Sequence, residues 1–225
     1  DVVRSRGLGD VYKRQLTRDF ADNIKLSSPV KSVRREQLGV RIELDDRTER
    51  FDQVIFACHS DQALALLSDA NCIESEILGQ LEYQANEVTL HTDESLLPKR
   101  KSAWASWNYW LDGAQGESER PPTLTYNMNI LQHIQAPVTF CVSLNSAHLI
   151  EPNKVLITFT YYHPVFSEQS MQAQKRRQEI NGQDKVWFCG AYWYNGFHED
   201  GVKSALDVVR ELKQLNKVER QRGAA

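Results

Sequence analysis

The sequence lacks a long apolar run, a paired-cysteine motif and an excess of charge of either sign. No stretch approaches the roughly 20 apolar residues that a membrane helix needs, and no apolar core marks the front end as a signal peptide. A net charge of −3 gives no electrostatic footprint for nucleic acid or an anionic membrane. The 225 residues are 41% hydrophobic and 25% charged, which is ordinary for a globular protein with a real core. We therefore expect a small-molecule partner, and no nucleic acid.

Metal-binding and thiol motifs are also missing. The four cysteines form no CxxC pair, so we expect buried free thiols in a reducing, cytoplasmic compartment; they are Cys58, Cys72, Cys141 and Cys189. His198 and Glu199 begin a pattern that in zinc proteases continues to a second histidine, but that position is Val202. The sequence therefore predicts no metal site.

The first fifteen residues contain no nucleotide-binding loop. Gly7 and Gly9 suggest GxGxxG, but the third glycine is replaced by Tyr12 and no β-branched strand precedes them. The stretch 1–15 does not join smoothly to the residues after it and resembles a translated sequencing adapter. We interpret it as a non-native leader, with native sequence beginning near Leu16 inside a longer gene.

Apolar patterning divides the rest of the chain into three parts. Alternation around residues 30–51 predicts a three-stranded meander, and the unbroken apolar run 54–58 predicts a strand buried on both faces of a parallel sheet. Ser60 is the expected N-cap of a helix over 61–67. The middle part is rich in aromatic and β-branched residues, and its expected strands are 83–93, 103–111, 123–129 and 154–162, with a polar loop at 113–122 and a polar helix or loop at 169–180.

The last part contains the pattern that points to a ligand. A short strand at 186–189 is followed by a glycine-containing loop and an amphipathic helix whose predicted apolar face is Val202, Ala205, Val209 and Leu212. Unpaired amides and the dipole at the start of that helix suit an anion or an electron-rich carbonyl. Glycines let a ligand approach the backbone closely, although any strand–loop–helix contains some; here they are Gly190, Gly196 and Gly201.

Several motifs together resemble one family. GFHEDGVKSAL after WFCGAYW is similar to the C-terminal flavin motif of the flavin-containing amine oxidase and phytoene desaturase superfamily, closest to the bacterial branch labelled NAD/FAD-binding proteins. FDQVIFACHSDQAL, SAWASWNYWL, TYNMNILQ and HPVF support it. The resemblance implies an α/β fold, in which an incomplete, Rossmann-like FAD-binding domain of the glutathione-reductase type (16–68 and 184–222) carries an inserted α+β substrate domain (69–183) built on a mixed, largely antiparallel sheet.

The resemblance also assigns roles to residues. Gly190 approaches the FAD pyrophosphate and ribitol, and Ala191 replaces a frequently acidic position, so that its contact comes from the backbone alone. The backbone of Val30 holds the adenine edge, and the strand passing the pyrophosphate ends at Ala57 and Cys58. The remaining expected contacts, in the glycine loop and under the flavin pyrimidine carbonyl, are Gly196, Asp200, Gly201 and Val202.

Substrate and catalytic residues are less clearly marked. Trp107 and Tyr109 are expected to form part of an aromatic wall around an apolar substrate, or to be ordinary core and sheet residues. Tyr192 and Tyr194 precede the flavin loop as further substrate candidates. His198 is expected near the flavin edge as a proton donor or acceptor, or in a structural hydrogen bond.

The expected function is hydride transfer from an apolar or amphiphilic substrate to flavin N5, in a longer parent enzyme. Because the GxGxxG loop has no counterpart in these 225 residues, we expect the chain alone to bind FAD weakly or not at all. Two alternatives stay open: an inactive portion of the parent, or a protein that uses FAD structurally.

Overall fold

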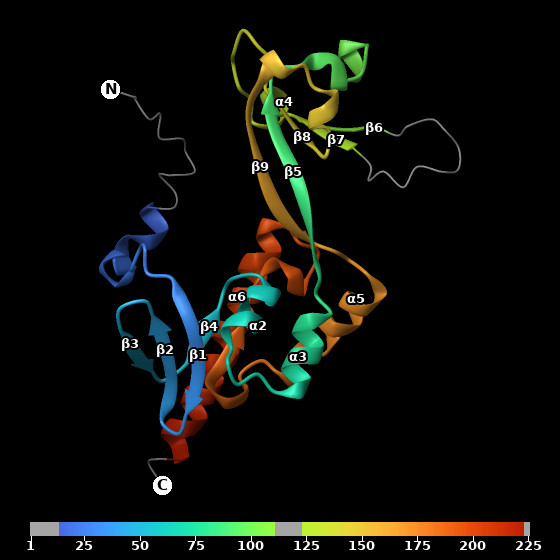
Figure 1. The fold of residues 1–225 in the computed structure, drawn as a ribbon. Coiled ribbons are helices and arrows are strands. Elements are labelled where there is room, and N and C mark those ends of the chain that lie inside the picture. Colours follow the sequence, from blue (N-terminus) through green and yellow to red (C-terminus); the bar gives the residue numbers. More distant parts are fainter. Residues whose placement is uncertain (1–13, 111–122, 223–225) are drawn as a thin grey trace. The chain divides into compact units, whose positions relative to one another are not determined.

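The computed structural model describes residues 14–110 and 123–222, without the side chains of Trp110, Asn216 and residues 218–222. Most of the expected leader and the polar loop 113–122 lie outside the described residues. The chain forms two compact units. Unit 1 combines the chain up to Gly79 with the chain from Lys175 onward, and unit 2 is Gln80–Gln174. Figure 1 shows the elements of each unit.

The meander of unit 1 forms where alternation predicts it. After a 3₁₀ segment, η1 (Arg18–Asn23), the antiparallel strands are β1 (Val30–Glu36), β2 (Gly39–Leu44) and β3 (Thr48–Phe51). Gly39 is required at the first turn because a Cβ there would collide with the carbonyl oxygen of Phe51. A bridge between Val33 and Leu67 connects this sheet to the residue that follows the helix Ser60–Leu66.

The second sheet of unit 1 brings together strands that are far apart in sequence. β4 (Val54–Phe56) pairs in parallel with β10 (Val186–Phe188), and the rings of Phe56 and Phe188 stack with centroids 5.5 Å apart. Parallel pairing agrees with the prediction for this apolar run. The prediction that the run is buried on both faces is wrong at Ile55, which is 43% exposed although Trp187, its partner in β10, is 1% exposed.

Helices complete unit 1. They are α2 (Ser60–Leu66), α3 (Cys72–Gly79) and α6 (His198–Arg222), with 3₁₀ turns η6 (Arg177–Glu179), η7 (Gln183–Lys185) and η8 (Ala191–Trp193). The N-cap of α2 is His59, not Ser60 as predicted. Ala205 and Leu212 of α6 pack against the core of Trp187, Cys189 and Val208. Val202 and Val209 do not: they are 53% and 39% exposed, so the buried face of α6 is rotated from the predicted one.

Unit 2 is built on a five-stranded antiparallel sheet with the order β6-β7-β8-β5-β9. The strands are β5 (Tyr83–His91), β6 (Trp107–Trp110), β7 (Thr123–Asn127), β8 (Cys141–Leu144) and β9 (Val155–Pro164). The predicted strands 83–93, 123–129 and 154–162 correspond to β5, β7 and β9. β6 begins later than predicted, so Trp104 lies outside it, and β8 was not predicted.

Short helical segments connect these strands. They are η2 (Glu94–Leu96), η3 (Lys101–Ala103), α4 (Met128–Leu131), η4 (Ala147–Leu149), η5 (Pro152–Lys154) and α5 (Glu168–Lys175), which reaches the boundary with unit 1. The segment 169–180 was expected to be either a helix or a loop, and it forms the helices α5 and η6. In the part of the chain that the structure describes, no helix is both long and apolar enough to cross a bilayer.

Asp93 fixes the connection after β5. Its side chain is 2% exposed, and its carboxylate accepts the amides of Ser95 and Glu151, both at 3.0 Å. Burial by itself would raise the pKa of Asp93, but these two amides and Lys154 outweigh it and lower the pKa to about 2. The ionised carboxylate therefore joins η2 to the start of η5 through these two amides.

Acid is expected to destabilise unit 2 through Asp93. Because the folded pKa lies below the ordinary 3.8, the stabilisation is complete above about pH 4 and disappears as the pH falls toward 2, a loss of about 2 kcal/mol. Urea unfolding between pH 7 and pH 2.5 should show that the difference between wild type and Asp93→Asn shrinks toward acid. Glu151→Gln, which changes an exposed partner of Lys154, is the control; an Asp93→Asn difference that is independent of pH would contradict the prediction.

Candidate cofactor-binding site

The carboxyl ends of β4 and β10 lie side by side. The Cys189 amide donates to the carbonyl of Phe56 at 2.9 Å, which extends the parallel pairing by one residue. Directly beyond the strands, Ala57 is exposed and Gly190 is partly exposed. In open α/β sheets ligands bind at the carboxyl ends of parallel strands, so the two chain segments following these strands form the candidate site.

The turn at residues 190–194 folds back onto the start of α6. The Gly190 amide donates to Ser204 Oγ at 2.9 Å, and that hydroxyl donates to the carbonyl of Gly201 at 2.9 Å. The Ala191 amide has no hydrogen-bond acceptor among the described residues, and its nitrogen lies 4.0 Å from where a Cβ on Gly201 would stand. Thus the Gly190 amide is already used, whereas the Ala191 amide remains available to a ligand.

The first turn of α6 is open to solvent. Residues 195–199 are exposed, and Gly196 has φ +86°, a left-handed conformation that favours glycine. Asp200 Oδ2 accepts the amide of Phe197 at 3.0 Å, which satisfies the amide just before the helix. A Cβ on Gly201 would meet only the Ala191 nitrogen, so there is room for a ligand to approach the backbone.

All of the predicted cofactor contacts therefore belong to one unit. The strand ends at Ala57 and Cys58, the 190–194 turn and the helix start at Asp200, Gly201 and Val202 are all in unit 1. Val30 begins β1 in the same unit, paired with Leu44. The role of each of these residues stays a prediction.

The predicted substrate and catalytic residues have different surroundings. His198 is exposed as the first residue of α6. Tyr192 is 3% exposed and its ring packs against Gly190. Tyr194 donates from Oη to Asp207 Oδ2, a bond that raises the pKa of the phenol, with burial adding to it. Both tyrosines thus contribute to holding the turn.

Trp107 and Tyr109 lie in unit 2, on one face of the five-stranded sheet. Strand register places them in two cross-strand rows that contain only apolar or aromatic residues. These rows are Ile157–Leu90–Val142–Tyr126–Trp107 and Phe159–Val88–Leu144–Leu124–Tyr109. We call this surface the apolar face. Its outer members are well exposed, at 45% for Trp107, 61% for Tyr109 and 45% for Phe159.

The opposite face of the same sheet is polar, although its members are mostly buried. The row between the two apolar rows is Thr158–Thr89–Ser143–Thr125–Asn108. Ser143 Oγ is 2.7 Å from Thr125 Oγ1 and 2.8 Å from His91 Nε2. His91 Nδ1 accepts the Asp93 amide, so Nε2 carries the proton and donates to Ser143; burial lowers the pKa of His91. The pair is therefore structural, because this histidine cannot act as a base toward the serine.

An antiparallel sheet with one solvated face normally buries its apolar side. Here most polar side chains of the central row are buried, while the outer apolar ones reach solvent and only Val88 and Leu124 of the two apolar rows are buried. A contiguous apolar surface of this kind marks a binding surface. Sequence reasoning identified Trp107 and Tyr109 but missed Tyr126 and Phe159, because only the strand register shows that they share a face.

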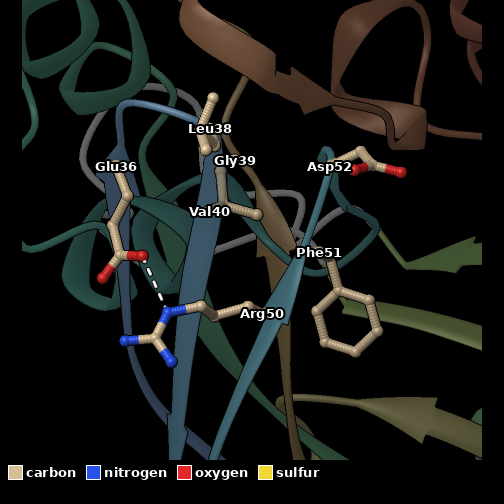
Figure 2. A pocket seen from close by; sticks show the side chains of 7 residues that line it. All are labelled: Glu36, Leu38, Gly39, Val40, Arg50, Phe51 and Asp52. Atoms are coloured by element: carbon tan, nitrogen blue, oxygen red, sulfur yellow. Dashed lines mark hydrogen bonds and ion pairs between the residues drawn. The ribbon is translucent and has the colours of Figure 1, made fainter.

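A hollow of about 270 Å³ opens elsewhere in unit 1, at the turn between β1 and β2 (Figure 2). Arg50 Nε donates to Glu36 Oε2 across it at 2.9 Å. It is lined by Glu36, Leu38, Gly39, Val40, Arg50, Phe51 and Asp52. None of the predicted site residues lines this hollow, so it is not the candidate cofactor site.

The cysteines are free thiols, but only Cys141 and Cys189 are buried as expected, since Cys58 is partly exposed and Cys72 is exposed. Burial raises the pKa of Cys58 and Cys189, and raises that of Cys141 to about 12. These thiols are therefore protonated and poor nucleophiles near neutral pH. Among the described residues no group of three or more histidine, cysteine or acidic side chains is placed to hold a metal ion.

Comparison with known families gives one match. Residues 7–138 match the family described as "Flavin containing amine oxidoreductase", which is more than half of the chain. The match ends before the 190–194 turn and α6. No curated protein matches the sequence significantly.

Solved structures share the fold at low sequence identity. The chain is 13% identical to cyclohexylamine oxidase from Brevibacterium oxydans IH-35A, with a TM-score of 0.56 over 90% of this chain and 52% of that one. It is 10% identical to wild-type putrescine oxidase bound to putrescine (TM-score 0.60, 91% and 52%). It is 12% identical to a CLA-producing fatty acid isomerase from P. acnes (TM-score 0.54, 82% and 47%). The chain spans about half the length of these proteins.

Proposed function

Because the chain belongs to the flavin-containing amine oxidoreductase family, whose cofactor is FAD, we propose that it forms part of an enzyme that transfers a hydride from an apolar or amphiphilic substrate to flavin N5. In this proposal unit 1 contributes to a Rossmann-like FAD-binding domain and unit 2 is the inserted substrate domain. The domain limits expected from the sequence, 16–68 with 184–222 and 69–183, differ from those of the units, because residues 69–79 and 175–183 lie in unit 1. A cytoplasmic location is part of the proposal and is supported by the free thiols.

One observation supports the flavin site above the others. Parallel strands β4 and β10 end together, and the segment after β10 places the Ala191 amide beside the open backbone of Gly201. A planar ring needs such uncovered backbone, and its electron-rich carbonyl needs amide donors. The residues present therefore fit the isoalloxazine end of FAD. The proposed contacts are Ala57, Cys58, Gly190, Ala191, Gly196, Asp200, Gly201 and Val202, with Val30 for the adenine.

The residues of the chain would act mainly by positioning and electrostatics. FAD, when bound, supplies the hydride acceptor. The dipole at the start of α6 would favour negative charge at the flavin carbonyl, and the Ala191 amide would add a donor, whereas the Asp200 and Gly201 amides already donate to the carbonyl of Phe197. His198, exposed in the first turn of this helix, is the proposed proton donor or acceptor.

The apolar face of unit 2 supports the proposed substrate class. Its two rows contain neither a charged nor a hydrogen-bonding side chain apart from the tyrosine hydroxyls and the Trp107 indole. Such a surface excludes water and binds hydrocarbon or aromatic groups through buried area. We propose Trp107 and Tyr109, together with Tyr126 and Phe159, as substrate contacts.

Inactivity of the isolated chain is the second candidate, because the chain spans about half the length of the structures it resembles. In that case the full-length parent would be the enzyme and this chain would bind FAD weakly. A structural use of FAD without catalysis is separated from both by anaerobic reduction of the flavin in the parent with candidate amines and apolar substrates.

A flavin titration followed by amide NMR spectra tests the site. We expect millimolar FAD to shift the amides of Ala191 and of the first turn of α6. Gly201→Ala should weaken this binding about tenfold or more, because its methyl would occupy the ligand's space, while the chain stays as stable as wild type or gains up to about 1 kcal/mol. Gly79→Ala, at the end of α3 with nothing within 4 Å of its Cβ, should bind FAD like wild type. FAD that shifts amides elsewhere in the chain but leaves these unshifted, or that binds Gly201→Ala equally well, would contradict the site.

A further inference from the structure

Arg177 is a buried cation whose partners all lie next to the candidate cofactor site. Its side chain is 7% exposed, and it comes from η6, outside both the 190–194 turn and α6. Nη1 donates to Asp207 Oδ2 at 3.1 Å and Nη2 donates to the carbonyl of Ser204 at 2.9 Å. The guanidinium also lies over the ring of Trp193, 5.6 Å from its centroid. A buried charge persists only when it is paired, so these contacts fix Arg177 and its partners to one another.

Asp207 links Arg177 to Tyr194, at one end of the turn. Its Oδ2 accepts both the Tyr194 hydroxyl and Arg177. Burial alone would raise the pKa of Asp207, but the bonds from Tyr194 and Arg177 lower it, so the carboxylate is charged. Lys203 Nζ lies 4.1 Å from the Tyr194 ring centroid and gives the ring a further contact with α6.

Ser204 links Arg177 to Gly190, at the other end of the turn. Its hydroxyl accepts the Gly190 amide and donates to the carbonyl of Gly201, while its own carbonyl accepts from Arg177. Both ends of the turn are therefore attached to the second and third turns of α6, and Arg177 contacts both attachment points. Between them lies Ala191, whose amide nitrogen is near Gly201.

We propose that Arg177 is a positioning residue for the cofactor site: through Asp207 and Ser204 it holds the 190–194 turn so that the Ala191 amide stays beside the first turn of α6. The inference rests on the proposed function for the identity of the ligand. The positioning itself is a property of the ligand-free chain and can be measured without flavin.

Hydrogen exchange of the ligand-free chain, followed by mass spectrometry, tests the positioning. Arg177→Met should raise amide exchange across residues 190–194 about tenfold, because two charged hydrogen bonds are lost, while β10 and unit 2 exchange as in wild type. Arg177→Lys should restore part of the protection, because an ammonium group can replace one of the two bonds. Arg176→Met is the matched control, since the neighbouring Arg176 pairs with the exposed Glu76 and Glu179; it should leave the turn unchanged.

A purely structural role would give a different result. Exchange that rises equally in β10, α3 and the turn, or that does not rise in the turn, overturns the proposal. If Arg177→Met does not fold, Tyr194→Phe removes only one hydroxyl from the same network and should raise exchange at residues 191–194; unchanged exchange in this variant also overturns it. In the FAD titration, Arg177→Met should lose the Ala191 shift that Arg176→Met keeps. Failure of FAD to bind any variant would count against the proposed function and leave the exchange result intact.

Discussion

Replacing Glu74 with alanine is expected to lower the free energy of unfolding of unit 1 by about 2–3 kcal/mol, because it removes the completely buried partner of Arg35, which keeps only Asp69. Glu74 is completely buried, and its carboxylate accepts from Arg35 Nη2 and from the Asn71 amide. Asn71 Oδ1 in turn accepts the Glu74 amide, which completes a reciprocal cap at the start of α3. The free energy of unfolding of a domain is about 5–15 kcal/mol in total, so this loss is a large fraction of it. Urea unfolding monitored by circular dichroism measures it.

Glu76→Ala is the matched control, with the same substitution two residues along the same helix. Its carboxylate is 51% exposed and pairs with Arg176, so the expected loss is at most about 1 kcal/mol. The double variant Arg35→Met/Glu74→Met should be more stable than Arg35→Met alone, because that single change leaves the buried Glu74 carboxylate without its cation. A Glu74→Ala loss as small as that of Glu76→Ala would show that the buried pair contributes little.

Gly190→Ala is expected to destabilise unit 1 by about 2–3 kcal/mol through overpacking. The added Cβ would stand 2.6 Å from Cδ1 of the Tyr192 ring and still nearer to Cε1, and this ring is 3% exposed with little room to move. The backbone at Gly190 is extended (φ 164°), so the cost comes from the collision and not from a conformation that only glycine adopts. Thermal unfolding of the wild-type and Gly190→Ala chains measures this loss of stability.

A double-mutant cycle with Tyr192→Ala identifies the cause. In that background the ring is gone, and Gly190→Ala should cost less than about 0.5 kcal/mol. Gly201→Ala serves as the second reference, because its Cβ has ordinary space. If Gly190→Ala lowers the free energy of unfolding equally with and without the ring, the collision with Tyr192 is not the reason for a glycine at this position. The outcome matters for the cofactor site, since the sequence alone suggested that Gly190 is a glycine for the sake of the ligand.

Local patterns predicted much of the fold. Alternation located the meander, aromatic and β-branched composition located β5, β7 and β9, and the unbroken apolar run located β4. β8 escaped prediction because it has only four residues, Cys141–Leu144, and its role as the strand between β7 and β5 comes from long-range pairing. Likewise, the apolar spacing of α6 predicted a helix, but its buried face depends on what it packs against: Ala205 and Leu212 contact the core, while Val202 and Val209 stay exposed.

The candidate site divides in the same way. The glycines, the strand end and the helix start are contiguous or patterned in sequence, so they could be named in advance. The network of Arg177, Asp207 and Ser204 could not, because its members come from two separate segments and their pairing follows no sequence pattern. Tyr192 and Tyr194 were predicted at the substrate; the structure places one in the core and bonds the other to Asp207, where they support the turn.

By itself the sequence determined which residues alternate, where the strand, glycine turn and helix follow one another, and which family the motifs resemble, since these depend on neighbours along the chain. Only the tertiary structure decided that β4 and β10 end together, that the Gly190 amide is occupied while the Ala191 amide is open, and that the sheet of unit 2 buries most of its central polar row and exposes the outer residues of its apolar face. The physical reason is that hydrogen-bond partners and covering side chains come from residues distant in sequence, and a local pattern cannot specify which distant segment supplies them.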